Sequence, residues 1–116
     1  MRTRCLRNLK KPPASRRTNP PRRADCAKDF LKDWERLSRF GRYDMKRAKA
    51  VMLQLIANDA PLEPERKDHA LKGAWATYRE CHVGGDFPIA YRIEDADGSS
   101  GSVYFARMGT HAELFE

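Results

Sequence analysis

The hydrophobic pattern of this 116-residue chain changes its period once, near residue 60. Upstream, apolar residues recur at every third or fourth position within residues 27–40 and again within 44–58, which predicts two amphipathic helices. Downstream, they alternate within residues 74–83, 87–93 and 102–108, which predicts three half-buried strands. The sequence therefore predicts an α+β fold.

Short connections constrain how these elements pack. Gly41 is suited to ending the first helix, Asp44 can cap the second, and Pro61 stops it. A turn at residues 84–86 joins the first two strands, and residues 22–26 could form a short edge strand. We expect the order (β)-α-α-β-β-β, with a small antiparallel sheet packed against an αα-hairpin.

Basic residues are concentrated at the N-terminus. The net charge is +7, yet residues 1–23 hold nine of the 23 Lys and Arg residues and no acid, so the other 93 residues have a net charge of −2. Residues 1–21 are also rich in proline and almost without apolar periodicity, which predicts a disordered tail before a single domain at 22–116. The tail is either a solvated leader or a segment attracted to RNA phosphates.

Cysteine usage and hydropathy indicate the compartment. The three cysteines, Cys5, Cys26 and Cys81, are widely spaced and fit neither a disulfide framework nor a zinc-ligand pattern. No apolar run reaches transmembrane length, and no apolar stretch follows the N-terminal charges as in a secretory signal. We expect a cytoplasmic protein that does not bind a membrane.

The three histidines, His69, His82 and His111, stand in separate segments of the C-terminal half. His82 ends one predicted strand, Asp86 begins the next, and His111 follows the third. In an antiparallel meander these positions lie at one edge of the sheet, and His69 comes from the loop that enters it. We expect the four side chains to gather there, with Arg79 and Arg92 as nearby cations.

Such a set suits acid and base catalysis on an RNA phosphodiester, because histidine both gives and takes a proton near neutral pH. Three histidines and an aspartate could instead bind zinc. However, they show no HxxxH or HExxH pair on a helix, which zinc enzymes often use. We therefore expect neither a metal nor a cofactor.

Several spaced motifs resemble one known family. They are Lys67-Asp68-His69-x-Leu71-x-Gly73-x-Trp75, Tyr78-Arg79-x-x-His82-Val83-x-x-Asp86, Ile89-x-Tyr91 and Arg107-x-Gly109-Thr110-His111-x-x-Leu114-Phe115. In this order they resemble YafQ-type toxins, the mRNA-interferase branch of the RelE/ParE superfamily, over about residues 24–116. The resemblance implies a RelE-like fold and a ribosome-dependent endoribonuclease that cuts mRNA in the A site. It also implies inhibition by a cognate antitoxin, with DNA contacted only through the antitoxin complex.

The family's functional positions fall on His69, His82, Asp86, His111 and Phe115 here. As a hypothesis, His69 or Asp86 is the base and His111 the acid. His82 and Arg79 would hold the phosphate, and Arg92 would also bind the substrate. Phe115 would stack on a nucleobase.

Two other functions share the same fold. A ParE-like toxin would inhibit gyrase without cleaving RNA, and an inactive toxin would act only in a repressor complex with its antitoxin. The three histidines favour the ribonuclease, because the ParE branch characteristically lacks such an acid and base set.

Overall fold

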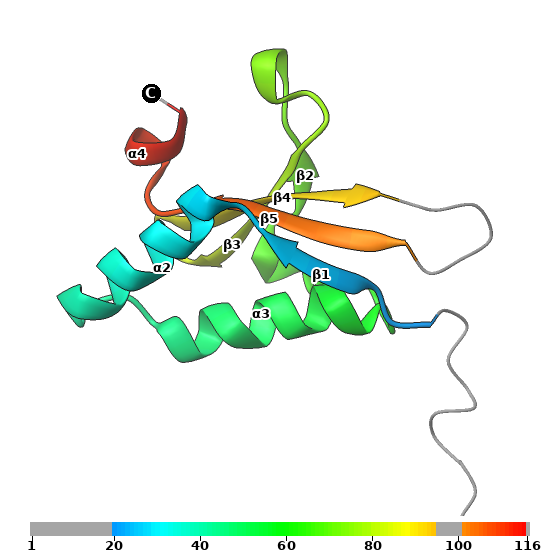
Figure 1. The fold of residues 1–116 in the computed structure, drawn as a ribbon, viewed down its shortest axis with the longest axis horizontal. Helices are drawn as coiled ribbons and strands as arrows, with labels where there is room; N and C mark the ends of the chain where they lie inside the picture. The colour runs from blue at the N-terminus through cyan, green and yellow to red at the C-terminus, as the bar shows by residue number, and fades with distance from the viewer. Residues whose placement is uncertain (1–19, 95–100, 116) are drawn as a thin grey trace, which may run out of the picture.

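A five-stranded sheet forms the centre of the molecule (Figure 1). The computed structural model describes residues 20–94 and 101–115, except for the side chain of Phe115. The strands, in the spatial order β1-β5-β4-β3-β2, are β1 (Arg23–Cys26), β5 (Ser102–Met108), β4 (Phe87–Glu94), β3 (Arg79–Gly84) and β2 (His69–Ala70). All neighbouring pairs are antiparallel except β1 and β5, which run parallel. The predicted α+β class is confirmed, with a sheet that is mostly antiparallel.

The two predicted helices form an αα-hairpin, α2 (Lys28–Phe40) and α3 (Met45–Ala57). Gly41 ends α2 with a φ of 73°, a left-handed conformation that favours glycine. The Asp44 carboxylate accepts a hydrogen bond from the backbone N of Arg47 at 2.9 Å and so caps α3. The residues singled out in the sequence therefore end one helix and begin the other.

One face of the sheet packs against this hairpin and forms the core. Its fully buried side chains come from both helices and from three strands, among them Phe30, Leu37, Ala48, Val83, Ile89, Val103 and Phe105. In Figure 1, α3 lies along this face, whereas α4 (His111–Phe115) and the loop that carries the short helix η3 (Gly73–Trp75) lie on the other side. The second face is therefore where side chains of β3, β4 and α4 can meet.

The predicted strand at 74–83 is wrong in its first half. Residues 73–75 form η3, and β3 begins only at Arg79. Gly73, with a φ of +67°, begins the turn of η3, and this turn replaces the extended conformation that alternation alone suggested for residues 74 and 75. The two-residue strand β2 at His69, placed in a loop by the sequence, pairs with β3.

Two predicted segments lie outside the described residues. They are the tail at 1–21, of which only Pro20 and Pro21 are described, and most of the polar hairpin loop at 95–101. A further short helix, η2 (Pro64–Arg66), precedes β2. No helix within residues 20–94 and 101–115 is long and apolar enough to cross a bilayer.

Candidate active site

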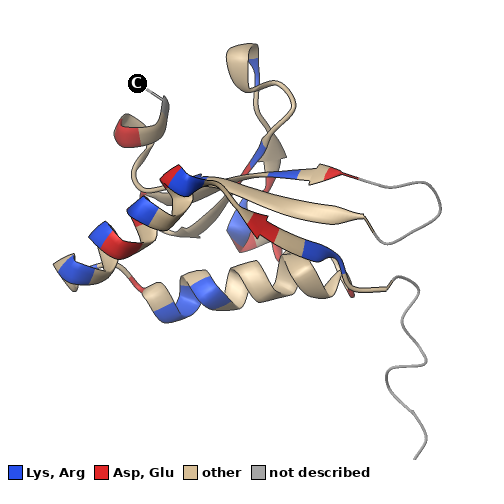
Figure 2. Ribbon diagram, in the orientation of Figure 1, with Lys and Arg blue, Asp and Glu red and all other residues tan. Residues whose placement is uncertain are grey.

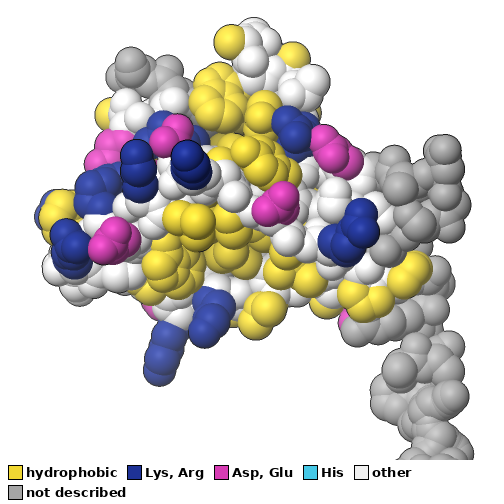
Figure 3. Space-filling model, viewed as in Figure 1, with side chains coloured by type: hydrophobic (Ala, Val, Ile, Leu, Met, Phe, Trp, Pro, Cys, Tyr) yellow, Lys and Arg dark blue, Asp and Glu magenta, His cyan; other side chains and the backbone are white. Residues whose placement is uncertain are grey.

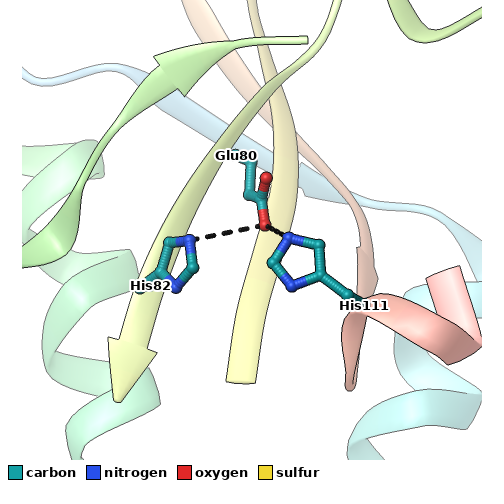
Figure 4. Close-up of side chains that lie close together, drawn as sticks. All are labelled: Glu80, His82 and His111. Carbon is teal, nitrogen blue, oxygen red and sulfur yellow. Dashed lines mark ion pairs between the residues drawn. The ribbon is translucent and has the colours of Figure 1, made fainter. Parts of the chain in front are cut away.

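A buried carboxylate, that of Glu80, lies among the three histidines. Glu80 is 2% exposed, and its Oε1 is 3.2 Å from Nε2 of His69. Its Oε2 is 3.5 Å from Nε2 of His82 and also contacts Nε2 of His111 (Figure 4). We call His69, His82 and His111 the histidine cluster. Side chains from three separate segments thus share one carboxylate, which the sequence did not single out.

Strand pairing explains three of these positions. Glu80 and His82 are two residues apart on β3, so their side chains point to the same face of the sheet. His69 lies directly opposite Glu80 in the β2–β3 ladder, which places its side chain on that face too. The ring centroids of His69 and His82 are 6.4 Å apart, and those of His82 and His111 are 5.5 Å apart. His82 is therefore a neighbour of both other rings.

The start of α4 positions His111. The backbone N of Thr110 donates to the Glu113 carboxylate at 3.0 Å, and the backbone N of Glu113 donates to the Thr110 hydroxyl at 3.2 Å. This reciprocal pair is a capping box. Gly109 precedes it with a φ of +153°, and a Cβ there would collide with the Glu113 carboxylate. Arg36 of α2 donates to the same carboxylate at 3.1 Å and ties α4 to the helical hairpin.

Asp86 lies beside His111, as the sequence predicted. Its Oδ1 accepts hydrogen bonds from the backbone N of His111 at 3.0 Å and from Nδ1 at 3.1 Å. These bonds, the backbone one first, hold the pKa of Asp86 below its ordinary value. Nδ1 of His111 thus faces Asp86 while Nε2 faces Glu80. The ring of His111 is therefore held between two carboxylates.

The same side chains could hold a metal ion. Glu80, His82 and His111 each offer a ligand atom, and these atoms lie within 4.8 Å of one another. Imidazole nitrogens together with a carboxylate are ligands suited to zinc or copper. Glu80 was not among the candidate residues named from the sequence, so this set of three metal ligands was not predicted.

Arg79 lies apart from the histidine cluster. It alternates with Glu80 and so points to the helix side of the sheet, where its Nε and NH2 donate to Asp68 at 3.3 and 3.0 Å. The Asp68 carboxylate also accepts a hydrogen bond from the Tyr91 hydroxyl. Arg79, Asp68 and Tyr91 line a cavity of about 430 Å³ beside the end of α3.

Arg92 is on the same face as Glu80 but further along β4. Its NH1 donates to the Tyr78 hydroxyl at 2.8 Å, and its NH2 pairs with Glu94 at 2.9 Å. Its guanidinium lies between the rings of Tyr78 and Tyr104, 5.1 and 4.8 Å from their centroids. The structure therefore brings His69, His82, Asp86 and His111 together but neither Arg79 nor Arg92. The side chain of Phe115, at the end of α4, lies outside the described part.

Comparison with known families identifies the fold. Residues 22–116 match the model of a family described as the bacterial toxin of type II toxin–antitoxin systems, YafQ. The chain belongs to the YafQ family. The resemblance inferred from the spaced histidine motifs is thus confirmed over the whole predicted domain.

Relatives in this family are similar over most of their length. The chain is 42% identical over 72 residues to the mRNA interferase toxin YafQ of Escherichia coli K12, covering 62% of this chain and 73% of that protein. It is 28% identical over 94 residues to a putative toxin YafQ of Haemophilus influenzae, covering 80% and 91%.

Solved structures of bacterial toxins agree with the fold. The E. coli DinJ–YafQ complex contains a chain that is 36% identical, with a TM-score of 0.70 and coverage of 82% of this chain and 99% of that one. A copper-bound mutant toxin from Helicobacter pylori is 35% identical, with a TM-score of 0.70 and coverage of 80% and 98%.

Proposed function

We propose that this chain is the toxin of a type II toxin–antitoxin pair and an endoribonuclease that cleaves mRNA on the ribosome without a metal. Membership of the YafQ family and the name mRNA interferase of the E. coli relative support this proposal. The observation that carries the chemistry is the histidine cluster around Glu80, with Asp86 beside it.

The three rings suit the two proton transfers of RNA cleavage. The 2′-hydroxyl attacks the neighbouring phosphorus as a base removes its proton, and the 5′-oxygen leaves as an acid protonates it. These steps give a 2′,3′-cyclic phosphate and a 5′-hydroxyl. Because attack and departure occur on opposite sides of phosphorus, base and acid must flank the phosphate. In the proposal His69 and His111, each a neighbour of His82, flank the phosphate that His82 contacts.

Each residue then has a definite role in the proposal. His111 is the proposed acid, because its two ring nitrogens face the carboxylates of Asp86 and Glu80. His69 is the proposed base: its Nδ1 lies 2.7 Å from the Lys67 carbonyl oxygen, which leaves Nε2, beside Glu80, as the nitrogen that accepts the proton. His82 contacts the phosphate between them, and Asp86 fixes the orientation of His111. Phe115 stays a proposed stacking residue for a nucleobase.

The partners follow from the same assignment. We propose a cognate antitoxin, as in the complex of the E. coli relative with DinJ, and contact with DNA only through that complex. The mRNA in the ribosomal A site is the proposed substrate, and the cytoplasm is the proposed location.

Mapping of mRNA ends after induced expression tests this function. Wild type should produce new 5′-hydroxyl ends on translated messages, and His111→Gln should reduce their rate of formation by about 10²- to 10⁴-fold, the usual contribution of a general acid. Glu35→Gln, on the exposed side of α2, is the matched control and should cleave normally. Absence of cuts with wild type, or full cleavage by His111→Gln, would refute the proposal.

A further inference from the structure

Neither arginine that the sequence assigned to the RNA substrate lies in the proposed site. Glu80 and Asp86 add two carboxylates to it, whereas Arg79 and Arg92 are held elsewhere. A single strand carries one negative phosphate per nucleotide, so a strand that passes Asp86 requires positive charge close by. Such charge is present on the other side of Asp86, at Arg42 and Arg47.

A second pocket, of about 290 Å³, begins at Asp86. It lies between the connection of α2 to α3 and the turn from β3 to β4, and is lined by Arg42, Tyr43, Asp44, Arg47, Val83, Gly84, Asp86 and Phe87. We call it the turn pocket. Because Asp86 also holds His111, the turn pocket and the histidine cluster are adjacent along one path over the surface.

The charge around the turn pocket has the required sign. Residues 36–49 contain six Lys and Arg residues and a single acid. Figure 2 shows basic positions at the end of α2 and the start of α3, whereas the rest of α3 carries none. In the space-filling view, Lys and Arg side chains gather over the same part of the molecule (Figure 3). This is the positive field that an RNA strand beside Asp86 needs.

Two arginines in particular face the pocket. NH1 of Arg47 lies 3.5 Å from the position that a Cβ on Gly84 would occupy, so its guanidinium rests on the β3–β4 turn. Its ion pair with Asp44, at 3.6 Å, is half exposed and therefore weak. The Arg42 guanidinium lies over the ring of Tyr43, 5.9 Å from its centroid.

The pocket also has an aromatic wall. The Tyr43 and Phe87 rings are 4.9 Å apart, and Phe87 is anchored at 5% exposure, whereas Tyr43 is half-buried. An aromatic ring beside arginines is the usual means of holding a single-stranded nucleotide, with the base stacked and the phosphate paired.

We propose that the turn pocket binds a nucleotide of the substrate strand next to the cleaved bond. Arg42 and Arg47 contact its phosphate, and its base stacks on Tyr43. The inference rests on the proposed ribonuclease function and adds a substrate subsite to it. Ribosomal RNA has the same phosphates and is the alternative occupant that the experiment must separate.

Combining a variant of the protein with a modified mRNA distinguishes binding of the substrate strand from binding of ribosomal RNA. Ribosomes carry a synthetic mRNA in which one phosphate at a time, within two nucleotides of the cut, is a neutral methylphosphonate, and single-turnover cleavage is measured. Arg47→Gln should slow cleavage of the normal message by about tenfold or more, as for the loss of a hydrogen bond to a charged group. At one phosphate position the methylphosphonate should cause no further loss in Arg47→Gln, because both changes remove the same contact.

The base contact is tested in the same way. Tyr43→Leu should slow cleavage of the normal message but respond little to an abasic nucleotide at that position, whereas Tyr43→Phe keeps the ring and should behave as wild type. Arg23→Gln, an exposed arginine on β1, is the charge-matched control and should show the full methylphosphonate effect at every position.

The outcomes distinguish failure of the substrate subsite from failure of the ribonuclease function. Independent, multiplicative effects of Arg47→Gln and methylphosphonate at all scanned positions would overturn the substrate subsite and point to ribosomal RNA. Wild-type rates in Arg42→Gln and Arg47→Gln would overturn it as well. No cleavage by the wild type would instead refute the ribonuclease function itself.

Discussion

Replacing Glu80 by glutamine removes one charge and keeps the shape of a side chain that is only 2% exposed. Breaking a buried ion pair usually costs about 3–5 kcal/mol, because a buried charge is left without its partner. Here two of the three partners that remain are about half exposed, His69 at 52% and His111 at 43%, whereas His82 is 18% exposed. The removed group is the buried one, so its desolvation cost disappears with it. We expect a change in unfolding free energy within about 1 kcal/mol of zero.

Activity should respond very differently. Glu80 contacts all three rings of the histidine cluster, and loss of their alignment can reduce the cleavage rate by about 100-fold. The assays are single-turnover cleavage of ribosome-bound mRNA and thermal unfolding, where 1 kcal/mol corresponds to about 4–8 °C for a domain of this size.

Asp33 provides the matched comparison, because among the residues that the structure describes it is the other buried acid, at 4% exposure. It accepts hydrogen bonds from Nε of Arg107 at 2.7 Å and from the backbone N of Met108 at 3.0 Å. Arg107 keeps its charge at any ordinary pH, so Asp33→Asn should cost about 3 kcal/mol. A Glu80→Gln variant as unstable as Asp33→Asn at pH 8, or one with full activity, would show that Glu80 is an ordinary structural residue.

Three further results are expected. Asp86 has a depressed pKa because of its bonds to His111, so it stabilises the fold above its unfolded pKa and loses that contribution as pH falls through the folded value. Asp86→Asn should therefore weaken the dependence of the melting temperature on pH between about pH 2 and 5. The same pH dependence in wild type and variant would contradict this. Cu²⁺ or Zn²⁺ should inhibit cleavage through the histidine–carboxylate grouping, EDTA alone should not, and isothermal titration should show weaker binding by His82→Gln. Gly109→Ala should disturb the capping box through Glu113 and cost about 1–2 kcal/mol, measured by urea unfolding, with a slower cleavage rate.

The sequence anticipated the parts of the site that depend on the order of the strands. His82, Asp86 and His111 come together because ends and starts of consecutive antiparallel strands adjoin. Glu80 had a signal as well, since it stands two residues before His82 on the same strand. The burial of Glu80 had no signal in the sequence, because it depends on how β2 and α4 pack around this side chain.

The positions of Arg79 and Arg92 differ from the prediction for two separate reasons. Arg79 is three residues from His82, an odd separation in a strand, so alternation already places it on the other face. Arg92 has the right face but a position further along β4, which a pattern of period two cannot distinguish. Likewise, alternation does not specify a partner, so the parallel pairing of β1 with β5 could not be inferred.

The bond from Arg36 to Glu113 connects the outer surface of α2 with the cap of the helix that carries His111. Any protein that takes Arg36 for its own carboxylate competes with Glu113, and we expect this competition to shift the ring of His111, which that protein does not touch. Pairs whose side chains are about a third exposed, as here, are worth up to about 1 kcal/mol, so the coupling amounts to about fivefold at most. The cleavage rate proposed for this toxin would then depend in a graded way on what binds Arg36, at a distance from the scissile bond.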